Sequence, residues 1–186
     1  MGCKLLPFRD YDEHEVSNLF KYSGSVPVDE GTIVTICAGA GWSQSNSDTQ
    51  LLGGAGKSYA NTVSDRYGVY AQVRTAATGD AYPVGMLLAA VKEEDENGEK
   101  LLYNPRKQAE MGVVLSGQAV PIVSRGIFLY SGSVVTDQTV TPGNFLRSDA
   151  NGLLTTGTAG TDHANVAQAL GPVDATYKSI LIKLRL

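Results

Sequence analysis

The stretch VTPGNFLRSDANGLLTT, residues 140–156, alternates turn-forming residues with short apolar segments. Pro142 and Gly143 predict a turn, because proline presets φ and glycine accepts the positive φ that many residues cannot. Residues 145–148 favour a short strand. The segment 149–152 ends in Asn-Gly, which suits a hairpin turn, and residues 153–156 would pair as the return strand. The stretch therefore predicts a β-hairpin and not a catalytic site.

The end of the chain continues this pattern. Residues 166–170 (VAQAL) predict another strand, and residues 179–185 (SILIKLR) predict the closing one. In the closing segment one face would hold Ile180, Ile182, Leu184 and Leu186, and the other would hold Leu181, Lys183 and Arg185. A period of two is typical of a half-buried strand. The C-terminal third thus predicts a small β-barrel or sandwich.

Three features of this region carry a resemblance. They are the hairpin pattern P-G-x-(hydrophobic pair)-x-S-D-x-x-G-L-L-T, the V-A-x-A-L that follows, and the last strand of aliphatic residues alternating with basic ones. Together they resemble the C-terminal part of capsid decoration (cement) proteins of tailed bacteriophages. The N-terminal PFRDYDEHEV, residues 7–16, resembles the opening of structural proteins from such phages.

The resemblance implies a virion structural protein on the capsid surface, made in the host cytoplasm. Its expected partner is the major capsid protein, and the expected form is a homo-oligomer, for which a trimer on local threefold sites is one arrangement. By this analogy, and for Trp42 by composition, we expect the partner-binding residues to be Pro7, Phe8, Arg9, Tyr11 and Trp42. A head-fibre base or tail component in low copy number is an alternative. So is a carbohydrate-binding or surface-binding β module, in which Trp42 and exposed tyrosines would form a stacking platform.

Composition sets the remaining limits. A chain of 186 residues can bury one good core, and its 18% charged residues and 21 glycines favour an all-β domain that hides surface against a partner. The net charge of -4 argues against nucleic-acid binding. We expect Cys3 and Cys37 to be free thiols. The sequence shows neither an apolar run of membrane-spanning length nor a signal peptide, so no membrane association is expected.

We expect two parts in the chain: an N-terminal arm of residues 1–24 and a β-barrel or sandwich domain of residues 25–186. Within the arm, Asp10 or Asp12 would cap a short helix whose apolar face, at i, i+3 and i+4, is Val16, Leu19 and Phe20. Two interpretations stay open. The helix packs on its own barrel, or the arm reaches a neighbouring subunit or coat protein.

The domain is expected to contain about ten short strands separated by turns. Besides the C-terminal ones, the segments 32–37, 67–74, 86–91, 101–103, 110–119 and 127–136 predict strands, with Pro121 and Gly126 ending or bulging them. Residues 92–100 hold five acids, two bases and an Asn-Gly pair, which predicts a solvated hairpin tip rather than a metal site.

No constellation for catalysis is recognisable. The segment GGAGKS, residues 53–58, lacks the glycine that a phosphate-binding loop needs at position 51 and a following helix. The two histidines, His14 and His163, have no nucleophile motif beside them. We therefore expect no enzyme, no cofactor and no metal.

Overall fold

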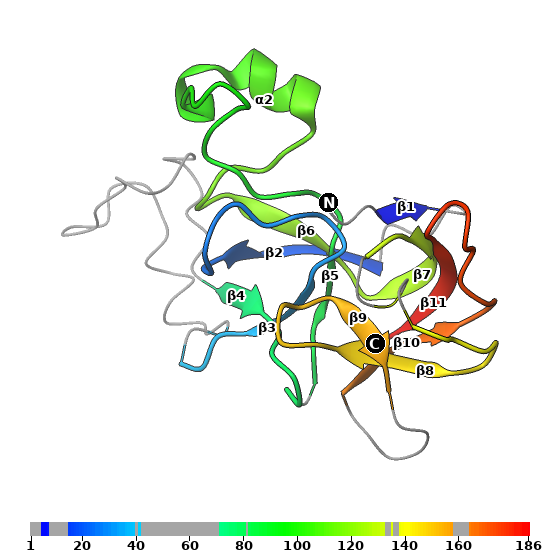
Figure 1. The fold of residues 1–186 in the computed structure, drawn as a ribbon. Helices are drawn as coiled ribbons and strands as arrows, with labels where there is room; N and C mark the ends of the chain where they lie inside the picture. Colours follow the sequence, from blue (N-terminus) through cyan, green and yellow to red (C-terminus); the bar gives the residue numbers. More distant parts are fainter. Residues whose placement is uncertain are drawn as a thin grey trace.

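The computed structural model describes residues 5–7 (backbone only), 15–39, 41, 71–80, 82–132, 135, 138–157 and 164–186. Its strands form two units, a six-stranded sheet and a closed five-stranded barrel (Figure 1). The sheet runs in the order β1 (Leu5–Pro7), β7 (Arg125–Tyr130), β11 (Ile180–Arg185), β10 (Asn165–Ala169), β8 (Phe145–Ser148) and β9 (Leu154–Thr156). The barrel runs in the order β2 (Val16–Tyr22), β4 (Gln72–Thr75), β3 (Ile33–Ile36), β5 (Gly85–Leu87) and β6 (Ala119–Val123). The expectation of a β fold is therefore confirmed, because the structure consists mostly of strands.

The C-terminal third forms the strands that its pattern predicts. β8 and β9 pair as an antiparallel hairpin with Ser148 opposite Leu154, and β10 and β11 pair antiparallel beside it. In β11 the even-numbered residues Ile180, Ile182 and Leu184 are buried, whereas Lys183 and Arg185 are exposed. The alternation of a half-buried strand is therefore confirmed.

The turn of this hairpin fastens the sheet to the barrel. The backbone N–H of Ile33 in β3 donates to the carbonyl of Gly152, with an N–O distance of 2.8 Å. Gly152 has φ of 74°, and a Cβ on it would lie 2.5 Å from the Thr75 methyl carbon and 2.8 Å from that of Thr32. Glycine is therefore needed here both for its backbone conformation and for the close approach of β3 and β4.

One core cluster spans both units. It includes Ile33, Met86 and Val123 from the barrel and Phe128, Tyr130 and Ile182 from the sheet. A second cluster fills the barrel interior and includes Phe20, Tyr22, Val73 and Ile122. A single residue, Ser124, separates β6 of the barrel from β7 of the sheet. Sheet and barrel therefore form a single folded body.

The segment that was expected to supply the apolar face of an arm helix is a barrel strand. β2 pairs parallel with β4 and antiparallel with β6. Its register shifts by one residue between Ser17 and Phe20, so that two residues of β2 lie opposite Pro121. Proline has no N–H to give to a neighbouring strand, and a bulge accommodates it. The residues expected to cap the helix, Asp10 and Asp12, lie outside the described residues.

The bulge explains why helical spacing was misleading. It separates Val16, which packs on the core shared with the sheet, from Phe20, which faces the barrel interior. Leu19, the third residue of the expected apolar face, is 48% exposed. β2 lies within the residues 1–24 that were expected to form an arm, so the end of that segment belongs to the barrel.

Two further predicted strands are absent from the described structure. Residues 101–103 form a 3-10 helix, η3 (Leu101–Tyr103), and α2 (Pro105–Met111) takes up the start of the predicted strand at 110–119. Pro121 lies inside β6 and Gly126 inside β7, so neither ends its strand. The expected strand at 67–74 is described only in part, as β4.

Candidate functional site

Residues 88–118, which join β5 to β6, form a projection that we call the lobe (Figure 1). β5 and β6 pair directly, with Leu87 opposite Ile122, and the Leu88 N–H donates to the Pro121 carbonyl at 2.9 Å. A short turn would be enough to connect two strands placed in this way. The lobe is therefore an insertion that barrel closure does not require.

The base of the lobe is held by backbone hydrogen bonds. Val91, which is fully buried, exchanges two bonds with Val28 at 2.9 and 3.0 Å. The Lys92 N–H donates to the Val114 carbonyl at 3.0 Å, and the Val114 N–H donates to the Ala90 carbonyl at 2.9 Å. Isolated β-bridges between Val28 and Val91 and between Val91 and Val114 thus hold the base of the lobe.

Helix α2 has local signals at both ends. The Asn104 side chain accepts from the Lys107 N–H, Pro105 occupies the first turn, and Gly112 ends the helix with φ of 63°. These are the residues preferred at the N-cap, N1 and C-cap positions. Beneath the helix the lobe has a small core of its own, made of Leu101, Val113 and Leu115 with Ala90 and Met111 packed against it.

The acidic turn of the lobe uses its charges internally. The Lys100 ammonium lies 2.6 Å from a Glu94 oxygen and 3.8 Å from a Glu93 oxygen. The hydrogen bond that the Lys100 ammonium donates to the Glu94 carboxylate, together with the negative charge of Glu94, raises the pKa of Lys100 above its ordinary value of 10.5. The Glu99 N–H, followed by other backbone N–H groups and Lys107, holds the pKa of Asp95 below its ordinary value of 3.8. These interactions stabilise the turn in the charged state.

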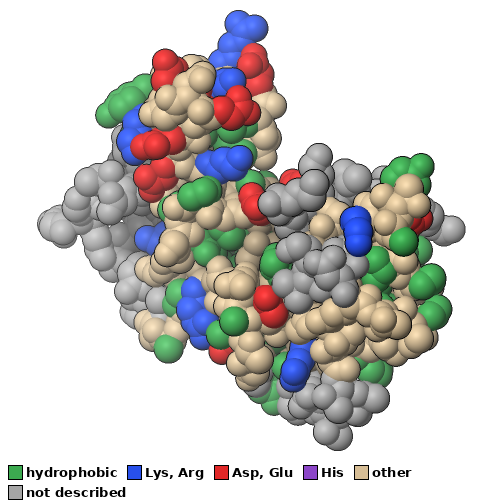
Figure 2. Space-filling view, in the orientation of Figure 1, with side chains coloured by type: hydrophobic (Ala, Val, Ile, Leu, Met, Phe, Trp, Pro, Cys, Tyr) green, Lys and Arg blue, Asp and Glu red, His purple; other side chains and the backbone are tan. Residues whose placement is uncertain are grey.

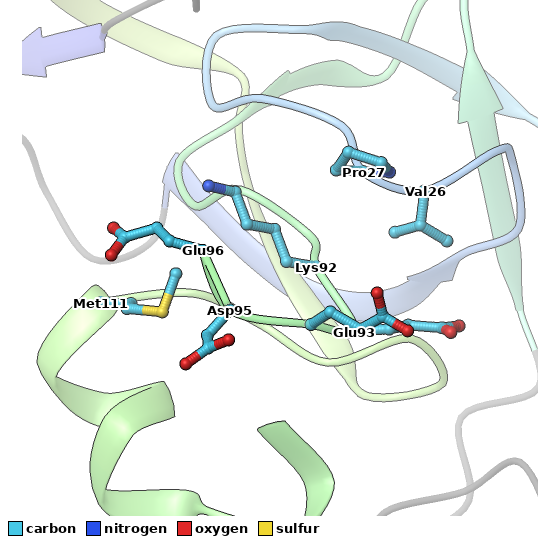
Figure 3. A pocket seen from close by; sticks show the side chains of 8 residues that line it. Val26, Pro27, Lys92, Glu93, Asp95, Glu96 and Met111 are labelled. Carbon is cyan, nitrogen blue, oxygen red and sulfur yellow. The ribbon is translucent and has the colours of Figure 1, made fainter. Parts of the chain in front are cut away.

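A hollow of about 400 Å³ lies between this turn and the barrel (Figure 3). Val26 and Pro27, from the connection between β2 and β3, line one side of it. Met111 lies across from them, and the turn supplies the remaining lining residues, Lys92, Glu93, Glu94, Asp95 and Glu96. In the part of the chain that the structure describes, no three His, Cys, Asp or Glu side chains are placed to hold a metal ion. The chemistry available in this hollow is ionic and apolar contact.

Large apolar side chains stand exposed at separate places. On the lobe, Leu102 is 51% and Tyr103 is 83% exposed; in the loop between β10 and β11, Leu170 is 40% and Tyr177 is 79% exposed. Figure 2 shows apolar side chains at the surface both on the lobe and on the opposite side of the molecule. Exposed aromatic residues on such projections are typical of protein interfaces.

The loop that carries Tyr177 is ordered by Asp174. Its carboxylate accepts from the backbone N–H groups of Thr176 at 2.8 Å and Tyr177 at 2.9 Å, and its own N–H donates to the Ser179 carbonyl at 2.8 Å. Because the loop is already ordered in this way, little further conformational entropy is lost when its aromatic side chain binds a partner.

Of the predicted partner-binding residues, the structure describes only Pro7, and their role stays a prediction. Pro7 lies in β1, at the edge of the sheet, opposite Phe128 of β7. Phe8, Arg9, Tyr11 and Trp42 lie outside the described residues, as do His14, His163 and the segment 53–58. Cys37 is a free thiol whose Sγ lies 3.9 Å from the Ser23 Oγ.

The exposed pair Leu102–Tyr103 was missed because the segment 101–103 was interpreted as a strand. The signal that would have found it is Asn104-Pro105, an N-cap residue followed by proline, which marks the start of a helix and ends any strand before it. For Tyr177 the signal is Asp174, which commonly organises a turn through its side chain.

Comparisons with known protein families, curated protein sequences and solved structures find no match to this chain. Among the described residues, no helix is both long enough and apolar enough to cross a membrane.

Proposed function

We propose that this protein is a virion structural protein that binds the outer surface of an assembled phage head and stabilises its coat lattice. The observation that carries the proposal is the C-terminal stretch. The residues that resemble phage decoration proteins form four strands of one sheet, which lie in the order β11, β10, β8 and β9.

The mechanism is thermodynamic linkage. A protein that binds the assembled lattice, but not the separated subunits, stabilises the lattice by its binding free energy. Because the same contact recurs at many sites, a modest affinity at each one adds up over the particle. Such a protein needs a stable body and exposed contact residues. The joined barrel and sheet, with Tyr103 and Tyr177 on separate projections, support this role.

Copy number in purified particles tests the proposal first. Quantitative mass spectrometry against the major capsid protein should give a number comparable to that of the coat subunit. A few copies per particle would instead indicate a vertex, head-fibre or tail component. Complete absence from particles would refute a virion role.

Binding to heads that lack the protein tests the surfaces. We expect Tyr103→Ser or Tyr177→Ser to weaken binding and to leave the melting temperature unchanged, because both side chains lie mostly in solvent. Lys183→Ser, at an exposed position of β11, is the matched control. If neither tyrosine variant binds less tightly than the control, these projections are not the contact surfaces.

The exposed tyrosines also suit a carbohydrate-binding module, in which aromatic rings stack on sugars. A glycan array separates the two functions. Binding to a defined glycan that is lost in Tyr103→Ser or Tyr177→Ser would favour the carbohydrate module over head decoration.

A further inference from the structure

The chain has two Asn-Gly pairs, at 97–98 and 151–152, and the first lies in the acidic turn of the lobe. The Asp95 carboxylate accepts from the N–H groups of Asn97 at 2.8 Å and Glu99 at 2.9 Å. The Asp95 N–H donates to the Glu99 carbonyl at 3.0 Å, and the Gly98 N–H donates to the Asp95 carbonyl at 3.2 Å.

The second pair lies in the hairpin between β8 and β9 and repeats this turn. The Asp149 carboxylate accepts from the N–H groups of Asn151 and Leu153, both at 2.8 Å. The Asp149 N–H donates to the Leu153 carbonyl at 2.8 Å, and the Gly152 N–H donates to the Asp149 carbonyl at 3.4 Å. The two Asp-x-Asn-Gly turns are therefore matched in sequence and in hydrogen bonding.

The surroundings of the two glycines differ. Gly98 is exposed, and a Cβ on it would meet nothing within 4 Å. Gly152 is buried against Thr32 and Thr75, and its carbonyl accepts from the Ile33 N–H. The backbone of Gly98 can therefore rotate without losing a contact outside its own turn, whereas the backbone of Gly152 is held by the barrel.

Asparagine followed by glycine is prone to an intramolecular reaction. The backbone nitrogen of the glycine loses its proton and attacks the side-chain carbonyl carbon of the asparagine. The new C–N bond closes a five-membered imide, and the side-chain amide nitrogen leaves as ammonia. Water then opens the imide at either carbonyl to give aspartate or isoaspartate, with no change in oxidation state. The attack requires the glycine peptide to rotate toward the side chain, so a fixed peptide slows it.

We propose that Asn97 is a site of spontaneous deamidation in the folded protein and that contact with the barrel protects Asn151. Each event adds a negative charge to a turn that already holds Asp95, Glu96 and Glu99. The isoaspartate product also routes the backbone through the side chain, which lengthens the turn that Asp95 closes. The modification therefore changes the charge and shape of the lobe surface and leaves the sheet untouched. It does not depend on the proposed function.

The experiment follows both sites by peptide mapping with mass spectrometry, with isoaspartate detected chromatographically. The intact native protein is incubated in mildly alkaline buffer at physiological temperature, and a second sample is incubated in denaturant. In denaturant the two pairs should react at similar rates, because both are Asn-Gly. In the native protein we expect Asn151 to react at least about tenfold more slowly than Asn97, a ratio equivalent to ~1.4 kcal/mol in the activation barrier.

Two variants sharpen the test. Deamidated protein carries one more negative charge and separates on ion exchange as a more acidic form. Asn97→Gln should abolish this form, because glutamine would have to close a six-membered ring, which is slower. Asn151→Gln should leave it unchanged. Equal native rates at the two sites, or faster reaction at Asn151, would overturn the proposal. So would a native Asn97 that stays unmodified over the time in which the denatured protein reacts at both sites.

Discussion

Gly85 shows that two strands of the barrel can pack closely because one residue has no side chain. A Cβ at this position of β5 would contact the Val123 backbone oxygen and lie 2.6 Å from the Ile122 Cγ2, both on β6. Moving the β6 backbone to relieve this overlap costs free energy, so we expect Gly85→Ala to lower the free energy of unfolding by about 1–3 kcal/mol. Gly171→Ala is the control, because a Cβ there meets nothing within 4 Å. Denaturant titration measures both, and equal midpoints would contradict the predicted overlap.

Asp80 makes stability depend on pH. Burial opposes its ionisation, but the Ala77 N–H at 2.7 Å and the Arg74 guanidinium at 3.0 Å outweigh this, and its pKa is lowered from the ordinary 3.8. A lowered folded-state pKa gives stability that is present above the unfolded pKa and is lost as the pH falls through the folded one. Because Arg74 is 43% exposed, we expect the contribution to be about 1 kcal/mol or less.

The measurement for Asp80 compares the unfolding free energies of the wild type and Asp80→Asn from neutral pH into acid. The wild type should be the more stable near neutrality. The gap should begin to close as the pH falls below 3.8 and should vanish below the lowered folded-state pKa, where Asp80 is protonated in both states. A gap that stays constant with pH would mean that the charge of Asp80 is not what stabilises this turn.

Among the elements, the lobe should be separable from the rest. Its core of Leu101, Val113 and Leu115 is distinct from the two larger clusters, and Val91 and Val114 form its base against the barrel. We expect a variant in which a short Gly-Ser linker replaces residues 93–112 to keep its β-type circular dichroism and one cooperative melt. Leu115→Ser in the full chain is the comparison, since it should loosen the lobe alone. Loss of cooperative melting in the linker variant would show that the barrel needs the lobe.

Strands in which buried and less buried residues alternate could be predicted from the sequence, and β8 and β11 are examples. Sequence reasoning failed where a tertiary contact overrides local spacing. The bulge of β2 depends on Pro121, about a hundred residues away in the chain, which spacing within residues 16–22 cannot reveal. The run at 101–103 has the composition of a strand, but Asn104-Pro105 starts a helix immediately after it.

The exposed residues of the candidate surfaces were harder still to predict. Tyr103 and Tyr177 are no more polar than the buried Tyr22 and Tyr130, so their exposure depends on which elements cover them. Their neighbours, Asn104 and Asp174, do mark turns in the sequence. Turn residues would therefore have been a better guide than hydrophobicity to the places where these aromatic side chains are exposed.

At the scale of the whole molecule, the shared core decides which part of the N-terminus can be removed. Glu15 lies before β2, and its carbonyl accepts from the Ser124 N–H at 3.1 Å, at the junction between barrel and sheet. β2 itself lies between β4 and β6 and brings Phe20 and Tyr22 into the barrel core. The chain before Glu15 contributes only the three-residue edge strand β1 to the described structure.

Two truncations follow from this arrangement. Deleting residues 1–14 should leave a cooperatively folded protein, because every barrel strand remains. Deleting residues 1–24 should abolish cooperative unfolding, because loss of Phe20 and similar large core residues costs about 3–5 kcal/mol each against a total stability of about 5–15 kcal/mol. Thermal melts and hydrogen exchange measure both, and a native-like melt after the longer deletion would refute the position of β2.

The shorter variant then tests the proposed arm. If Pro7, Phe8, Arg9 and Tyr11 contact the coat, it binds heads more weakly although it is folded, and undiminished binding would move the contact to the lobe and the β10–β11 loop.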